Sequence, residues 1–407
     1  MSARRYLRLL GATIAGLALL SIAFTILVDP YRMYGTPIIA GWTALKPRIY
    51  EQVGIAKTQQ LERVRPTTLL LGNSRTEIGL DPTSPSWPAG AQPVFNAAEA
   101  GKDLFTAWRM PQEAVAVRPP KTVVLGLDIY DFLFTRDSTS EALPPIGVDE
   151  RRLLVNRDGA PNPARPLQLW QDRYATTLTI DALVDSLETV FDQNGQTSTT
   201  MTVAGFNPLH EYRLFVARSG YHELFAQKNA IYEAQYRRYL KSDFADPTAN
   251  EGFRDLARIL ATVAARRIPL ILYIHPYHAD YLEMLHHAGL WESFETWKRA
   301  IVRVVAAAHQ AAPTVPLRLV DFSGYDTYST EAVPTAGDRQ SSMRWYWEPG
   351  HYKAALGDRI LARLFPSPRD EEAASWGRDL GPATIEADLA AIRRDREAYL
   401  KPLAGAR

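Results

Sequence analysis

Residues 67–77, with the sequence TTLLLGNSRTE, decide how the fold of this chain is interpreted. Their apolar run ends at a glycine and gives way to polar residues, which is typical of a strand that ends where a helix begins. In open α/β folds, ligands bind at the edge formed by the carboxyl ends of the parallel strands. Ser74 is expected to stand at that edge, so it is the first candidate nucleophile.

The same residues also have a purely structural interpretation. Ser74 and Glu77 form a capping box, in which an N-cap serine and a glutamate three residues later satisfy backbone N–H groups at a helix start. Motifs this short often occur by chance. Taken alone, the stretch favours the cap, and a catalytic role for Ser74 requires a base elsewhere in the chain.

Composition restricts the classes of function. The 407 residues include 46 Lys plus Arg against 45 Asp plus Glu, so the formal net charge is +1. A balanced charge gives no field that attracts nucleic acid, and no nucleic-acid partner is expected. The hydrophobic share of 46% is ordinary for a folded globular chain. The sequence has no cysteine, which excludes disulfides, cysteine-ligated zinc and thiol catalysis.

The amino-terminal segment predicts a membrane anchor. Arg4, Arg5 and Arg8 precede an uncharged apolar run at residues 9–28, which has the length of one bilayer-spanning helix. The run is longer than the apolar region of a usual signal peptide, which favours an uncleaved anchor. Basic residues gather before the run, so the amino end is expected in the cytoplasm and the main domain outside. In a bacterium this describes a single-pass inner-membrane protein with a periplasmic body.

Five apolar runs bounded by turn residues predict buried parallel strands. They are residues 67–71, 94–96, 122–127, 269–274 and 317–321. Helix-length segments separate the runs, which predicts an α/β fold: a layered α/β/α domain with a mainly parallel sheet. Helices are expected at residues 50–64, 232–240, 252–265, 290–311 and, as an amphipathic closing helix, 383–400.

The predicted domain organisation has four parts. They are an anchor at residues 1–30, a connecting segment at 31–66, the α/β domain at 67–370 and a helical tail at 371–407. The alternation of strands and helices lapses at about residues 129–250, which is interpreted as a large insertion. Its segment 137–166 is rich in Pro, Arg, Asp and Ser and is expected to form a lid or a partner surface near the carboxyl edge of the sheet.

A late segment offers the base that Ser74 requires. Residues 343–352, MRWYWEPGHY, place Glu348 three residues before His351 across a Pro-Gly turn. An acyl-transfer triad needs a histidine that takes the serine proton and a carboxylate that fixes the histidine tautomer. An isolated Glu-x-x-His is usually only a loop feature. Together with Ser74, however, the pair makes a candidate Ser–His–Glu site.

The two motifs together resemble a known family. Gly-Asn-Ser at 72–74 and Glu-Pro-Gly-His at 348–351 are similar to the first and last blocks of the SGNH/GDSL hydrolase superfamily, which read Gly-Asp-Ser and Asp-x-x-His. The resemblance covers about residues 67–364. It implies a flavodoxin-like, three-layer α/β/α fold with the nucleophile early and the base late in the chain.

The resemblance also implies a role for each matching residue. Ser74 would be the nucleophile, His351 the general base and Glu348 the residue that orients it. Gly101, after the second predicted strand, matches the second-block glycine, and its backbone N–H would hold the oxyanion together with that of Ser74. No cofactor is implied.

Three positions depart from the family pattern. Asn73 and Glu348 stand where the family has aspartate, and Asp128 stands where it has an asparagine that donates to the oxyanion. An ionised aspartate has no proton to donate. Either Asp128 is protonated, or another donor such as Asn73 replaces it, or the site is slow or inactive. A helix cap or an ion-pair partner is an equally acceptable role for Asp128.

Other residues near the expected edge are candidates for substrate binding. His275 and His278 follow a predicted strand and could contact a substrate or act as a second base. The spacing of His275 and His278, with Asp280 nearby, also resembles a metal-binding motif. The sequence has no matching cluster of ligands elsewhere, so no metal is predicted. Arg75 could contact an anionic substrate or pair with a surface acid.

The tryptophans Trp345 and Trp347 lie beside the late motif. Flat aromatic rings can stack on the apolar faces of sugars, although such residues more often belong to a core. They are therefore secondary candidates for carbohydrate binding.

The anchor, the exported body and the family resemblance together imply a class of function. They are most similar to the membrane-anchored branch of the superfamily, which includes alginate O-acetyltransferase-like and teichoic-acid D-alanylation-type proteins. This implies an O-acyltransferase or acylesterase acting on a cell-envelope polysaccharide, with a membrane-bound O-acyltransferase as partner. The alternatives are a catalytically inactive assembly or polysaccharide-binding component and, third, a plain lipase or esterase.

Overall fold

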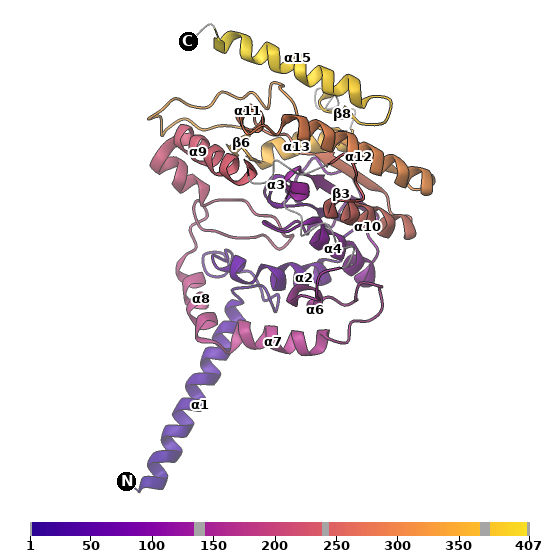
Figure 1. Ribbon diagram of the computed structural model, residues 1–407. Coiled ribbons are helices and arrows are strands. Elements are labelled where there is room, and N and C mark those ends of the chain that lie inside the picture. The colour runs from indigo at the N-terminus through magenta and orange to yellow at the C-terminus, as the bar shows by residue number, and fades with distance from the viewer. Residues whose placement is uncertain (1, 134–142, 238–243, 367–374, 405–407) are drawn as a thin grey trace. The chain divides into compact units, whose positions relative to one another are not determined.

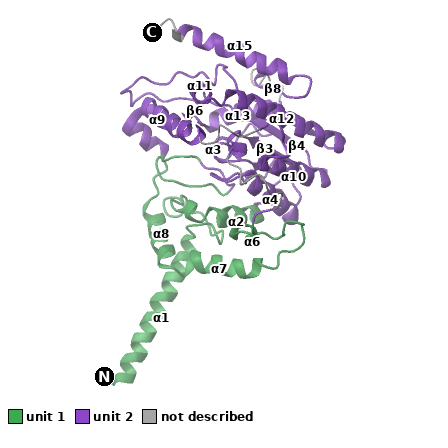
Figure 2. Ribbon diagram, in the orientation of Figure 1, with its two compact units in different colours: residues 1–63, 145–203, 208–211 green, residues 64–144, 204–207, 212–407 purple. Residues whose placement is uncertain are grey.

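The computed structural model describes residues 2–133, 143–237, 244–366 and 375–404 (Figure 1). The chain forms two compact units, drawn in different colours in Figure 2. Unit 1 contains residues 1–63, 145–203 and 208–211, and unit 2 contains residues 64–144, 204–207 and 212–407. The predicted insertion is therefore divided, because residues 145–203 join the amino-terminal segment. The start of the expected lid, residues 137–142, lies outside the described residues.

Unit 2 is an α/β unit built on a mainly parallel sheet. Its strand order is β2-β1-β3-β4-β5-β8, and only β8 is antiparallel to its neighbour. The strands are β1 (Thr68–Leu71), β2 (Val94–Asn96), β3 (Thr122–Leu127), β4 (Leu270–Ile274), β5 (Leu317–Asp321) and β8 (Arg378–Asp379). All five predicted strands are confirmed within one residue, and β8 is an addition that the apolar runs did not indicate.

The strands form because their residues are apolar on both faces, and helices cover those faces. On one face, Leu70, Val124 and Tyr273 share a core with Leu356 and Ile360 of α13 (Ala354–Leu364). The other face carries the β4 and β5 leucines, which pack on two longer helices. These are α10 (Glu251–Ala265) and α12 (Trp291–Ala311), which meet beside Leu270 and Leu317.

The remaining long helices follow the predictions with shifted ends. The predicted helix at 50–64 is a short 3-10 turn, Ile49–Gln52, continued by α2 (Val53–Val64). The first residues of the helix expected at 232–240 belong to α9 (Tyr212–Tyr236), which is interrupted by a kink at Gly220. Residues 238–240 of that prediction lie outside the described residues. The predicted closing helix is α15 (Ile385–Ala404), and the chain also has α4 (Leu104–Val117) and α11 (Ala279–His287).

Unit 1 is helical. It contains α1 (Ala3–Val28), α2, α6 (Val148–Arg152), α7 (Arg165–Thr177) and α8 (Ile180–Phe191). Among the described residues, α1 alone is long and apolar enough to cross a membrane. Its last residue is Val28. Asp29, the C-cap, has a left-handed φ of 49°, and its carboxylate accepts the backbone N–H groups of Tyr34 and Gly35.

The segment that contains Glu348 and His351 forms a β-hairpin, whereas the sequence indicated only a loop. β6 (Tyr346–Glu348) and β7 (His351–Tyr352) are antiparallel and form a separate two-stranded sheet. Pro349 and Gly350 make the turn between them. The hairpin places Glu348 directly opposite His351.

Candidate active site

The turn at Gly72 and Asn73 joins β1 to α3 (Ser74–Gly79), and Asn73 caps that helix. The Asn73 side-chain oxygen accepts the Arg75 backbone N–H at 3.0 Å. The predicted capping role of Ser74 is therefore wrong, because the cap lies one residue earlier. Ser74 is the first residue of the helix, and its hydroxyl group does not serve as the cap.

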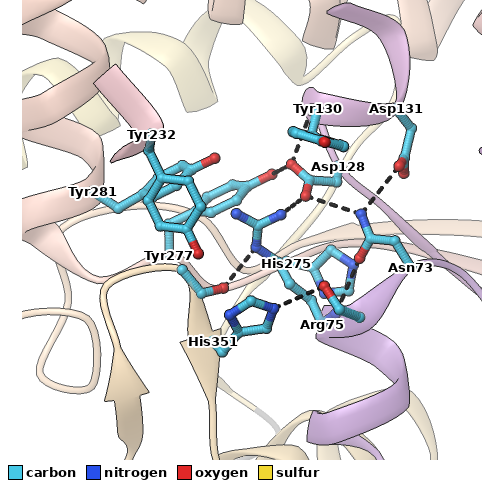
Figure 3. A network of polar contacts seen from close by, with 12 residues as sticks. Asn73, Arg75, Asp128, Tyr130, Asp131, Tyr232, His275, Tyr277, Tyr281 and His351 are labelled. Atoms are coloured by element: carbon cyan, nitrogen blue, oxygen red, sulfur yellow. Dashed lines mark hydrogen bonds and ion pairs between the residues drawn. The ribbon is translucent and has the colours of Figure 1, made fainter. Parts of the chain in front are cut away.

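Ser74, His351 and Glu348 form a hydrogen-bonded chain in unit 2. His351 Nε2 lies 2.8 Å from Ser74 Oγ, and His351 Nδ1 is hydrogen-bonded to Glu348 Oε1. Figure 3 shows the His351 ring near Arg75, with a dashed line that marks a hydrogen bond of the ring. To accept the serine proton at Nε2, the imidazole must carry its own proton at Nδ1, and Glu348 favours that tautomer. The predicted Ser–His–Glu constellation is therefore assembled.

Two further donors hold Glu348, whose side chain is buried. Oε1 also accepts the Tyr232 hydroxyl at 3.0 Å, and Oε2 accepts the Gly350 N–H at 2.9 Å. Burial alone raises the pKa of a carboxyl, but His351 and the Gly350 N–H outweigh it, so the pKa of Glu348 is lowered. Glu348 is therefore an ionised, fixed partner for the imidazole.

Tyr232→Phe removes one hydrogen bond to a buried carboxylate. We expect it to lower the free energy of unfolding by about 1–3 kcal/mol, measured by urea denaturation. The matched control is Tyr346→Phe, because the buried Tyr346 hydroxyl has no hydrogen-bond partner among the described residues. That variant should be at least as stable as the parent. Equal losses in the two variants would show that the Tyr232 bond contributes nothing specific.

Arg75 links α3 to the β6–β7 hairpin, which carries His351. Its side chain is buried, its Nε donates to the Gly350 carbonyl at 2.7 Å, and its guanidinium forms an ion pair with Asp128. The guanidinium carbon lies 5.2 and 5.0 Å from the ring centroids of Tyr277 and Tyr281. Arg75 does pair with an acid, but the prediction that this acid lies at the surface is wrong, because Asp128 is buried. The predicted contact of Arg75 with an anionic substrate stays a prediction.

Asp128 lies at the carboxyl end of β3 and is fully buried. Besides Arg75, its donors are the Tyr277 hydroxyl at 2.9 Å, the Asn73 amide at 3.1 Å and the Tyr130 N–H at 3.2 Å. Figure 3 shows these groups converging on the carboxylate. Four donors suit an ionised carboxylate, so Asp128 neither donates to an oxyanion nor contacts a substrate. Of the predicted roles, it has that of the ion-pair partner, and it also accepts the N–H of the first residue of the short helix Tyr130–Leu133, as a cap would.

The Asn73 amide is also occupied. Its nitrogen donates to Asp128 Oδ2 and to Asp131 Oδ1, each at 3.1 Å. An amide nitrogen has two protons, and these contacts use both of them. The predicted replacement of the missing oxyanion donor by the Asn73 side chain is therefore wrong.

Asp131 is the last member of this network, and its ionisation makes the free energy of unfolding depend on pH. Burial raises the pKa of its carboxyl to about 7, although Asn73 and Arg75 lower it. The protonated Asp131 carboxyl makes its full contribution to the free energy of unfolding at pH values below its unfolded pKa, which is near 4. This contribution is lost as the pH rises to about 7, because the carboxyl then ionises in the folded protein as well. We expect a loss of roughly 4 kcal/mol across that range.

Asp131→Asn removes the ionisation and keeps an acceptor for Asn73. We expect the variant to match the parent at pH 4 and to be more stable at pH 8, measured as the free energy of unfolding in urea. The control Asp158→Asn, on the exposed surface of unit 1, should keep the parent's pH dependence. An Asp131→Asn curve parallel to the parent's would contradict the assignment.

The loop that carries Gly101 is hydrogen-bonded to the turn at Gly72 and to α3. The Glu99 N–H donates to the Gly72 carbonyl at 3.3 Å, and the Ala100 N–H donates to the Glu77 carboxylate at 3.1 Å. Gly101 has φ +73°, and a side chain there would meet open space. The N–H of Ser74, as the first in its helix, has no acceptor within the helix. The two predicted backbone donors thus stand at the start of α3 and on the loop that is hydrogen-bonded to it.

His275 is fully buried beneath the hairpin, at the end of β4. Its Nδ1 lies 3.2 Å from the Tyr352 hydroxyl, and its Nε2 has no hydrogen-bond partner among the described residues. Burial, together with Arg75 and His351, holds the pKa of His275 well below its usual value, so the ring is neutral. The ring packs over Gly126, where a Cβ would lie 2.6 Å from His275 Cε1. The prediction that His275 opens into a crevice is wrong.

His278 caps α11. Its Nδ1 accepts the Asp280 N–H at 3.1 Å, and its Nε2 lies 2.8 Å from the Glu331 carbonyl, to which it donates. Both ring nitrogens are engaged in backbone contacts, so His278 is structural and does not bind substrate. Within the described ranges, no group of three or more His, Asp or Glu is arranged to hold a metal ion.

The two tryptophans are packing residues. Trp347 is buried, with Lys353 Nζ 4.4 Å from its ring centroid. Trp345 meets Tyr328 edge-on at 5.0 Å and stacks on Arg344. Of the two predicted roles, these contacts match the packing one.

Several residues of the network were not predicted from the sequence. They are Asp131, Tyr232, Tyr236, Tyr277 and Tyr281. Tyr277 precedes α11 and Tyr281 lies in it. Tyr232 and Tyr236 lie four residues apart in a segment predicted to be helical. This spacing puts side chains on one helix face and was a signal for a cluster. Nothing in the sequence indicated that the cluster would surround Arg75.

No family model, no curated protein and no solved structure matches this chain.

Proposed function

We propose that this protein is a membrane-anchored serine acyltransferase or acylesterase that forms an acyl-enzyme on Ser74. One observation carries the proposal: Ser74 Oγ lies 2.8 Å from His351 Nε2, while Glu348 binds the other ring nitrogen. A hydroxyl, an imidazole and an ionised carboxylate in this order are the parts that acyl transfer requires.

The residues would act in two steps. Ser74 Oγ attacks the carbonyl carbon of an ester while His351 takes the hydroxyl proton, and the N–H groups of Ser74 and Gly101 stabilise the oxyanion. The oxyanion collapses, the carbon–oxygen bond to the alcohol breaks, and His351 returns the proton to that alcohol. A second alcohol or water then attacks the acyl-Ser74 ester with the same histidine as base, which releases the enzyme.

The SGNH/GDSL resemblance supports the proposed fold and substrate class. The order β2-β1-β3-β4-β5 is that of flavodoxin-like sheets, with Ser74 after the first strand and His351 after the last parallel one. Helix α1 supports an inner-membrane anchor with a periplasmic body. We propose a cell-envelope polysaccharide as acceptor or donor and a membrane-bound O-acyltransferase as partner.

The test uses the full chain purified in detergent. A fluorophosphonate probe should label the protein, and peptide mass spectrometry should find the adduct on Ser74. Acetyl esters should compete with the probe. Faster turnover of long-chain lipid esters than of acetyl esters would favour the lipase alternative.

The second candidate is an inactive assembly or polysaccharide-binding component. It is favoured by Asp128, which is a carboxylate held by four donors at the position where the resemblance calls for an oxyanion donor. A folded protein that is not labelled at Ser74, alone or with membranes containing an acyl donor system, would support this candidate over the enzyme.

A further inference from the structure

Helix α8 in unit 1 has its polar side inward and its apolar side outward. Its buried residues are the small or polar Ala182, Ser186 and Thr189. Ile180 is 79% exposed and Phe191 is 83% exposed. The full set of exposed apolar side chains on the helix is Ile180, Val184, Leu187 and Phe191.

Helix α7 shows the same inversion. It buries Gln168, Asp172, Thr176 and Thr177. The exposed large apolar side chains, continuing to the residue after the helix, are Leu167, Trp170, Tyr174 and Leu178. We call these four side chains, together with the four exposed apolar side chains of α8, the α7–α8 apolar face. Pro166, Gln171 and Arg173 are exposed as well.

Helical spacing makes each set a continuous stripe. The exposed positions recur at intervals of three or four residues, which aligns them along one side of each helix. The exposed charges Arg173 and Asp181 lie roughly a quarter turn from these stripes at 3.6 residues per turn. Scattered exposed apolar residues are normal, but two adjacent stripes mark a surface that contacts something apolar.

The inward contacts fix this orientation. Arg152 Nε donates to the Asp172 carboxylate at 2.8 Å, and the Gln168 amide donates to it at 2.9 Å. On α8, the Tyr31 hydroxyl donates to Asp185. These buried polar contacts would be broken if either helix turned its apolar side inward.

The carboxyl end of α1 packs against α8 and α7. Thr25 and Val28 are buried there, whereas residues 3–15 of α1 are all exposed. Figure 1 shows α7 and α8 meeting α1 at its carboxyl end. The apolar face therefore adjoins the end of the helix that is long and apolar enough to cross a bilayer.

We propose that the α7–α8 apolar face lies in the interfacial layer of the bilayer that α1 crosses, on the side where α1 ends. Helices whose apolar side penetrates the headgroup and acyl boundary bind membranes in this way. Trp170 and Tyr174 suit that layer, because aromatic rings with a polar atom gather at membrane interfaces. The proposal goes beyond acyl transfer and does not depend on Ser74.

The absence of cysteine makes a site-specific test direct. Single cysteines are introduced in the full chain at Leu167, Ile180 and Phe191 and labelled with bimane. A label at Leu17 in α1 is the control for the bilayer. A label at Gly381 in unit 2, where an added Cβ meets no atom within 4 Å, is the control for water. Each protein is reconstituted in vesicles of phosphatidylcholine and phosphatidylglycerol.

We expect brominated lipids to quench labels at the three test positions as they quench Leu17, and iodide to quench only Gly381 strongly. Iodide quenching at the test positions equal to that at Gly381 overturns the proposal. Protection from both quenchers also overturns it and indicates a second copy of the chain on this face. A Leu17 label that lipids do not quench overturns the anchor and the proposal together.

Discussion

Ser74→Ala should abolish turnover of a chromogenic acetyl ester by the full chain. We expect kcat to fall by roughly 10⁴-fold or more, because removing a triad nucleophile leaves only binding and oxyanion stabilisation. KM should change little, because the hydroxyl contributes mainly to the chemical step. Labelling by a fluorophosphonate should disappear in the same variant.

The control for this prediction is Ser86→Ala, a partly exposed serine in unit 2. It should retain the parent's rate and labelling, and both variants should unfold at the same urea concentration as the parent. Residual turnover in Ser74→Ala comparable to the control would show that another nucleophile acts. No turnover in the folded parent itself would favour the inactive candidate.

Arg75→Met is expected to give the largest loss of stability. It leaves the fully buried Asp128 carboxylate without its cation and removes the bond from Arg75 Nε to the Gly350 carbonyl. Breaking a buried ion pair in this way costs about 3–5 kcal/mol. Urea denaturation of the purified full chain measures the loss.

Two comparisons separate the buried charge from the general effect of losing an arginine. Arg299→Met removes an exposed pair with Glu386 and should cost less than about 1 kcal/mol. The double variant Arg75→Met with Asp128→Asn should regain part of the loss, because no unpaired charge remains. A loss as small as that of Arg299→Met, or a double variant no better than the single one, would contradict this role of the pair.

The Arg75 contacts also bear on the proposed acyl transfer. The Arg75 side chain contacts the Gly350 carbonyl and the Asp128 carboxylate, so it joins the β6–β7 hairpin to α3. A conservative Arg75→Lys keeps the charge but cannot make both contacts in the same geometry. Its activity should therefore lie below that of the parent even where it folds.

Much of the sheet and part of the site were predictable because their signals are local. An apolar run that ends in turn residues is buried wherever it lies, so the five parallel strands could be found without knowing their neighbours. Ser74, Glu348 and His351 were found in the same way. Each stands in a short motif, but the interpretation of Ser74 depended on combining its motif with the one at Glu348 and His351, far along the chain.

Residues 67–77 alone left Ser74 between a cap and a nucleophile. Tertiary structure excluded the cap, because Asn73 caps the helix and leaves the Ser74 hydroxyl beside His351. The ion pair of Arg75 with Asp128, the loss of Asn73 as an oxyanion donor and the burial of His275 were also decided in three dimensions. The physical reason is that a charge is paired or exposed, and an amide occupied or available, according to which distant segments the sheet brings together. The inward polar side of α7 and α8 follows the same rule, since local sequence sets the stripe and only packing sets which side faces out.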